Sequence, residues 1–224
     1  MTSFPSHIQI IEVGPRDGLQ NQPKHISTQK KIEFIDALSK TGLKTIEASA
    51  FVHPEWIPQL SDANEVFAKI QRVQGVKYMA LVPNERGCSR ALASGVDEIS
   101  VLTAASESFC QRNTNTSLEG AIQRLKPIAE QAISSGVSIR GYISCVIACP
   151  YEQQTDLKVV RMIAQQMLDM GISTISLGET LGVALPERRA ERGDVGARRE
   201  RVGGARDGGG GAGAARQGDV DRHG

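Results

Sequence analysis

The chain has 224 residues and a formal net charge of +1 at pH 7. This length can bury one sizeable core, while the balanced charge implies no strong polyelectrolyte partner, so we expect no nucleic-acid binding. No apolar run approaches the about 20 residues that a membrane-spanning helix needs, and no membrane partner is expected.

The four cysteines form no CxxC pair, and no apolar segment follows a basic start at the N-terminus. Both features are typical of a cytoplasmic protein with reduced thiols. Cys145 and Cys149 are spaced C-x3-C, which could be half of a zinc site. Because no second Cys/His pair lies nearby, we predict two buried thiols instead.

Strand and helix patterns alternate along the chain. Such alternation predicts an α/β protein with a parallel sheet, either a doubly wound sheet or a (β/α)8 TIM barrel of which about six βα units are present. Thr28 is expected as the N-cap of the first helix and Gly42 as its C′ residue. The predicted strands are 8–13, 45–52, 76–82, 98–104, 138–146 and 173–178, and the predicted helices are 28–40, 61–73, 84–94, 117–135 and 155–170.

The composition changes at residue 187. Residues 187–224 contain nine Arg and eleven Gly but no Leu, Ile, Phe, Tyr or Trp. Such a segment cannot bury enough surface to offset its ordering entropy, and we predict that it is disordered. An out-of-frame translation of a GC-rich gene is the favoured origin; an RNA-binding Arg/Gly tail and an adhesion motif at 192–194 are the alternatives. The predicted domain therefore spans residues 1–186.

Polar residues follow several of the predicted strands. Arg16 and Asp17 come just after the first strand, Glu47 lies in the second, and Glu179 follows the sixth. Active sites of α/β barrels lie at the carboxyl ends of strands, and a cation beside a carboxylate suits a site that holds a metal and an anion. The alternatives are a surface pair of Arg16 with Asp17 and an internal ion pair of Glu47 with Arg16.

Six segments together resemble the hydroxymethylglutaryl-CoA lyases, which belong to the metal-dependent TIM-barrel aldol and Claisen enzymes. The resemblance implies cleavage of 3-hydroxy-3-methylglutaryl-CoA to acetyl-CoA and acetoacetate with Mg²⁺ or Mn²⁺, and homo-oligomers among intact relatives. The segments are VGPRDGLQNQ (13–22), TIEASAFVHPEWIPQLSD (45–62), LVPNERG (81–87), AASESF (104–109), RGYISCVIACPYE (140–152) and ISLGETLGV (175–183).

The resemblance also implies roles for single residues. Asp17 would be a metal ligand, since hard oxygen donors suit Mg²⁺. Arg16 would stabilise the thioester or enolate oxygen of the acyl-CoA, and Glu47 would orient Arg16 or metal-bound water. Glu179 stands where the family usually has Asp, and Gln20 and Tyr142 would line the substrate pocket, with packing as their alternative.

The sequence departs from the family pattern towards its C-terminus. A His-x-His pair, a late Asn and a Cys in a glycine-rich loop are expected there, and none is present. We therefore expect a lyase domain cut short by a frameshift, with little or no turnover. The alternatives are a lyase for another 3-hydroxyacyl-CoA and a catalytically dead fragment or Arg/Gly-tail binding protein.

Overall fold

The computed structural model describes residues 7–183, so the tail predicted at 187–224 lies outside the described residues. Six parallel strands form one curled sheet with the order β1-β2-β3-β4-β5-β8, which is an open, incomplete barrel. The predicted α/β class and barrel type are confirmed, and each predicted strand range contains one observed strand. The strands are β1 (Ile11–Glu12), β2 (Thr45–Ala50), β3 (Lys77–Leu81), β4 (Glu98–Ala104), β5 (Ser138–Ser144) and β8 (Thr174–Leu177).

Helices follow the strands, as the alternation predicts. The predicted helix 117–135 is two helices that meet at Arg124. One helix, α4, was not predicted, nor was the hairpin of β6 and β7. The helices are α1 (Thr28–Leu38), α2 (Ala63–Lys69), α3 (Glu85–Ala93), α4 (Glu107–Thr114), α5 (Leu118–Gln123), α6 (Leu125–Ser134) and α7 (Leu157–Asp169), and the hairpin pairs β6 (Ala148–Cys149) with β7 (Gln153–Gln154).

The boundaries of α1 differ from the prediction. Ser27, not Thr28, is the N-cap, because the Ser27 side chain accepts the Lys30 N–H while the Thr28 hydroxyl donates to Asp62. The helix ends at the C-cap Ser39, so Gly42 is not its C′ residue, although its φ of +92° still requires glycine.

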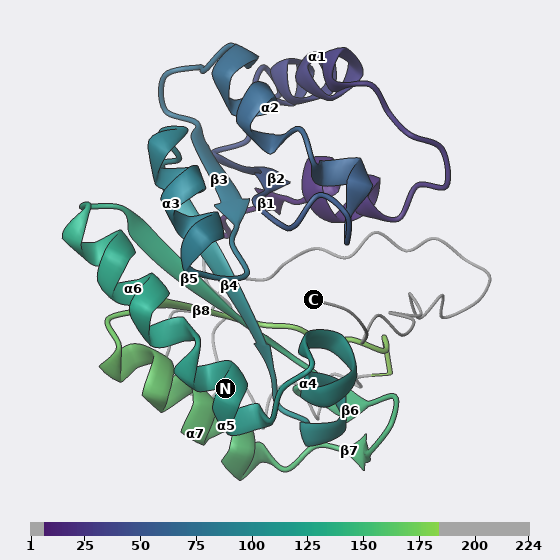
Figure 1. Ribbon diagram of the computed structural model, residues 1–224, viewed down its shortest axis with the longest axis vertical. Coiled ribbons are helices and arrows are strands. Elements are labelled where there is room, and N and C mark those ends of the chain that lie inside the picture. Colours follow the sequence, from purple (N-terminus) through teal and green to yellow (C-terminus); the bar gives the residue numbers. More distant parts are fainter. Residues whose placement is uncertain (1–6, 184–224) are drawn as a thin grey trace, which may run out of the picture.

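The two faces of the sheet have different chemistry. The outer face carries apolar side chains such as Ile46, Ile99 and Ile143, which pack with the buried sides of α1, α2, α3, α5, α6 and α7 into one large core. Figure 1 shows these helices along one side of the sheet, with α4 and the β6–β7 hairpin at the end far from α1. The inner face has a smaller apolar cluster that includes Leu81 and Tyr142, and this face also carries the charged groups described below.

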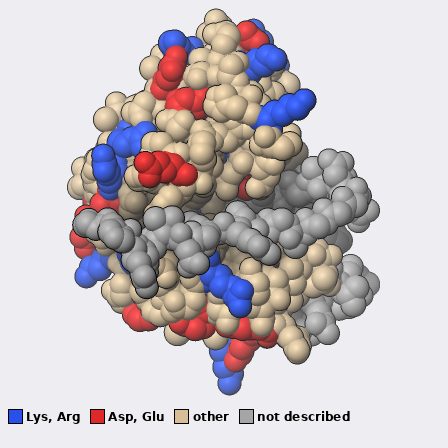
Figure 2. Space-filling model, turned by 45° about the vertical axis from the view of Figure 1, so that its right-hand side comes forward, with Lys and Arg blue, Asp and Glu red and all other residues tan. Residues whose placement is uncertain are grey.

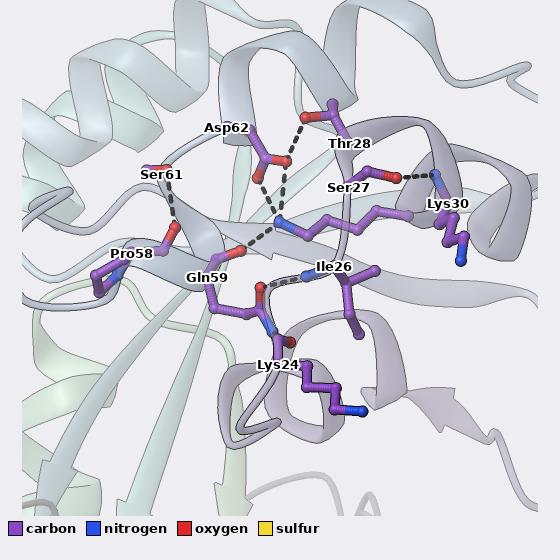
Figure 3. Close-up of polar contacts among 10 residues, drawn as sticks. Lys24, Ile26, Ser27, Thr28, Lys30, Pro58, Gln59, Ser61 and Asp62 are labelled. Atoms are coloured by element: carbon purple, nitrogen blue, oxygen red, sulfur yellow. Dashed lines mark hydrogen bonds and ion pairs between the residues drawn. The ribbon is translucent and has the colours of Figure 1, made fainter.

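A buried cation ties α1 to the segment before α2. The Lys31 ammonium donates to both carboxylate oxygens of Asp62 at 2.9 Å and to the backbone carbonyl of Gln59 (Figure 3). The Gln59 amide in turn bridges the Lys24 carbonyl and the Ile26 N–H, both at 3.0 Å. These contacts, which we call the Lys31 clamp, fix the chain that links the first strand to α1. Asp62 is the N-cap residue of α2, but its carboxylate pairs with Lys31 and makes no capping bond.

The surface shows no extended region of one charge on the face drawn in Figure 2, where acidic and basic side chains are interspersed. Within residues 7–183, no helix has the length and apolar character to cross a bilayer.

Candidate active site

Arg16 lies in a single π-helical turn, η1 (Gly14–Gly18), that directly follows β1. Its Nε and Nη2 atoms both lie 2.6 Å from Oε2 of Glu47, and its Nη1 lies 2.6 Å from Oδ1 of Asp17. Both contacts that the sequence offered as alternatives therefore exist together. The Arg16 side chain is 14% exposed, so it stands at the boundary between the sheet interior and the surface.

Glu47 is fully buried in β2 and faces inward with its carboxylate paired on both oxygens. Oε2 accepts from Arg16, and Oε1 accepts from the Ser100 hydroxyl on β4. The pairing of β2 with β3 shifts register between Glu47 and Ser49, and such bulges redirect side chains near functional sites. Burial alone would lower the pKa of Arg16, but the Glu47 and Asp17 carboxylates raise it above its ordinary value.

Two further predicted residues carry buried polar atoms that have no hydrogen-bond partner among the described residues. These atoms are the Tyr142 hydroxyl on β5 and Oε1 of Gln20. Burial, reinforced by the Glu47 charge, raises the pKa of Tyr142, so the phenol stays protonated at neutral pH. Buried polar groups normally have a partner, and these two groups suit a water or ligand.

A second buried ion pair joins β4 and β5. Nε of Arg140 on β5 donates to Oε1 of Glu98 on β4 at 2.8 Å, and Nη1 reaches the Ser176 hydroxyl on β8 at 3.3 Å. Lys77 and Ser138 contact the other oxygen of Glu98. From the sequence, Arg140 was recognised only within a motif, and Glu98 was missed. A carboxylate that opens the apolar run EISVL was the available signal.

Asp17 is exposed, with 57% of its side chain accessible, and one of its oxygens is paired with Arg16. Among residues 7–183, no group of three or more His, Cys, Asp or Glu side chains is placed to hold a metal ion. Asp17 alone is one hard oxygen donor, so the described residues do not by themselves make up a metal site.

Glu179 follows β8 at the other edge of the sheet from Arg16. Its Oε1 accepts the Val183 N–H at 3.2 Å. In the described part of the chain, no hydrogen bond or ion pair joins Glu179 to Arg16, Asp17 or Glu47. The structure thus brings together Arg16, Asp17 and Glu47, and leaves the role of Glu179 a prediction.

Cys145 and Cys149 are buried free thiols, as predicted. The Ser106 hydroxyl lies 2.9 Å from the Cys149 sulfur, and burial raises the pKa of Cys145 to about 12. The Cys145 thiol is therefore protonated at neutral pH and is not an activated nucleophile.

Comparison with known proteins identifies close relatives. The HMGL-like family model matches residues 7–195. The chain is 45% identical over 186 residues to the mitochondrial hydroxymethylglutaryl-CoA lyase of Macaca fascicularis, and 46% identical over 181 residues to the 3-hydroxy-3-isohexenylglutaryl-CoA/hydroxy-methylglutaryl-CoA lyase of Pseudomonas aeruginosa. These matches cover 83% and 81% of the chain but only 57% and 60% of the two relatives.

A solved structure agrees with the sequence matches. The HMG-CoA lyase of Brucella melitensis superposes with a TM-score of 0.83 at 42% identity, over 85% of this chain and 68% of that one. Because the relatives include mitochondrial and bacterial proteins, the expected cytoplasmic location stays a prediction.

Proposed function

The chain belongs to the HMGL-like family, and from this membership we propose that it serves the cleavage of 3-hydroxy-3-methylglutaryl-CoA to acetyl-CoA and acetoacetate. The observation that carries the proposal is the position of the Arg16 guanidinium. Arg16 lies just past the end of β1, and the fully buried carboxylate of Glu47 holds its side chain. An acyl-CoA is accordingly the proposed small-molecule partner. Homo-oligomers of intact relatives stay a prediction.

The proposed reaction needs a fixed cation. When a base takes the proton of the 3-hydroxyl group, its oxygen forms the carbonyl of acetoacetate, the bond between C2 and C3 breaks, and the electron pair moves onto the thioester as an enolate, which takes up a proton at C2 to give acetyl-CoA. Arg16 would stabilise that enolate oxygen, because three of its five N–H groups are used by Glu47 and Asp17 and two remain. Glu47 would orient Arg16, and Gln20 and Tyr142 would offer their unpartnered polar atoms to the substrate.

A divalent cation, Mg²⁺ or Mn²⁺, is the proposed cofactor and would supply Lewis-acid polarisation of substrate oxygens. Asp17 would provide one ligand, and the described residues do not complete the set. We therefore expect little or no turnover by this chain.

A second acyl-CoA is also a candidate substrate. The Pseudomonas aeruginosa relative, 46% identical, is named for both 3-hydroxy-3-isohexenylglutaryl-CoA and hydroxymethylglutaryl-CoA. The proposed substrate class is therefore a 3-hydroxy-3-alkylglutaryl-CoA, with the methyl compound as the first choice.

The test is calorimetric titration of the full chain with 3-hydroxy-3-methylglutaryl-CoA, with acetoacetate release measured in added Mg²⁺. Arg16→Ala should weaken binding by about 10- to 100-fold, because hydrogen bonds to charged groups contribute about 1.5–3 kcal/mol. Arg161→Ala, which removes an exposed arginine from α7, is the matched control and should bind like the wild type. A wild type that does not bind, or an Arg16→Ala variant that binds equally well, would refute the proposal for this chain.

A further inference from the structure

We propose that Ser100 is a positioning residue of this site, which sets the orientation of Arg16 through the Glu47 carboxylate. The inference rests on the proposed function, since it assigns Ser100 to the same acyl-CoA site. Ser100 lies on β4, 53 residues from Glu47 in the sequence, and both side chains are fully buried. The Ser100 hydroxyl lies 2.5 Å from Oε1 of Glu47.

The two oxygens of Glu47 have different partners. Both Arg16 atoms, Nε and Nη2, converge on Oε2, and the serine hydroxyl meets Oε1. This arrangement differs from the usual bidentate arginine–carboxylate pair, in which two parallel hydrogen bonds join two nitrogens to the two carboxylate oxygens. Ser100 thus occupies the oxygen that Arg16 would otherwise take, and it holds the guanidinium to one side of the carboxylate.

This offset determines which N–H groups of Arg16 stay available. With Nε and one Nη2 hydrogen on Glu47, and one Nη1 hydrogen on Asp17, the two remaining hydrogens belong to Nη1 and Nη2. Without the serine hydroxyl, Oε1 would be a buried anionic oxygen with no donor, which is costly. Rotation of the Glu47 carboxylate towards the bidentate geometry would relieve that cost, and it would move the Arg16 guanidinium away from its present place.

A small displacement at this position has a large effect. A shift of about 1 Å in a group that meets the reacting atoms can reduce catalysis about 100-fold. Within residues 7–183 the Ser100 hydroxyl bonds to Glu47 and makes no hydrogen bond to Arg16, so its effect on the site passes through Glu47.

The test compares Ser100→Thr with Ser100→Val in the full chain, because the two side chains have the same shape and differ in the hydroxyl. One measurement is the NMR resonance of the Arg16 Nε–H, assigned by its loss in Arg16→Ala. The other is calorimetric affinity for 3-hydroxy-3-methylglutaryl-CoA. We expect Ser100→Thr to keep the wild-type resonance and affinity, and Ser100→Val to shift the resonance and to bind at least about tenfold more weakly.

Each result decides the question. A Ser100→Val variant with the wild-type resonance and affinity would overturn the inference. If the wild type binds no acyl-CoA, the proposed function fails, while the resonances of the Thr and Val variants still show whether the hydroxyl positions Arg16. Ser100→Ala, which adds no volume, is the second hydroxyl-free variant; if it and Ser100→Val both unfold while Ser100→Thr folds, the hydroxyl serves the fold and the inference fails.

Discussion

Replacement of Lys31 by methionine should destabilise the protein strongly, because it removes the ammonium group that pairs with Asp62 in the Lys31 clamp. Methionine fills nearly the same volume, so the change is mainly one of charge and hydrogen bonding. The Lys31 and Asp62 side chains are 3% and 13% exposed. In Lys31→Met the Asp62 carboxylate keeps the Thr28 hydroxyl as a donor at 2.8 Å, and the Gln59 carbonyl loses its ammonium partner.

Removal of one partner of a buried ion pair costs about 3–5 kcal/mol. The slight exposure of Asp62 and its remaining bond to Thr28 place the expected loss near the lower limit, at about 3 kcal/mol. The measurement is urea unfolding followed by far-ultraviolet circular dichroism. Loss of the clamp should also speed amide exchange at Ile26, whose N–H bonds to Gln59.

The matched control is Lys69→Met, since Lys69 pairs with Glu65 on the exposed side of α2, where the two side chains are 59% and 51% exposed. An exposed helix pair contributes only about 0.3–0.5 kcal/mol. If Lys31→Met lowered the free energy of unfolding no more than Lys69→Met does, the clamp would not order this part of the fold and our reasoning would be wrong.

Three further results are expected. Glu47→Gln should lower the free energy of unfolding by about 3 kcal/mol in urea, since it leaves a buried guanidinium without its full counter-charge; an unchanged value would contradict the buried pair. Gly141→Ala should cost about 1–3 kcal/mol in the same assay, because its added methyl would lie 2.6 Å from the Met167 sulfur, whereas Gly18→Ala, with no atom within 4 Å, should cost less. Burial raises the pKa of Cys88 from 9.0 to about 11, so above pH 9 the unfolded thiol ionises first and the free energy of unfolding should fall by about 1.4 kcal/mol per pH unit up to pH 11. That slope should be smaller in Cys88→Ala, and equal slopes would mean that this thiol is not protected in the folded chain.

The sheet could be predicted from the sequence because each strand is a short, local apolar run. Arg16 and Glu47 could be paired for a related reason, since neighbouring parallel strands bring their carboxyl ends to one edge. Ser100 could not be found this way: nothing within its own strand distinguishes it from a packed serine, and its partner is 53 residues distant. The π-helical form of η1 also escaped prediction, because its hydrogen bonds converge on the single carbonyl of Val13 and leave no periodic pattern.

The positions of Arg16 and Glu179 at the two edges of the sheet have a mechanical consequence. Five parallel pairings separate β1 from β8, and each contributes a twist of about 20–25°. A change of a few degrees of twist in each pairing would therefore add up across the sheet. The distance between Arg16 and Glu179 thus depends on strands that carry neither of these two residues. A substitution in the central strands β3 or β4 that alters their twist would therefore change the distance between β1 and β8 without contacting either of these edge strands.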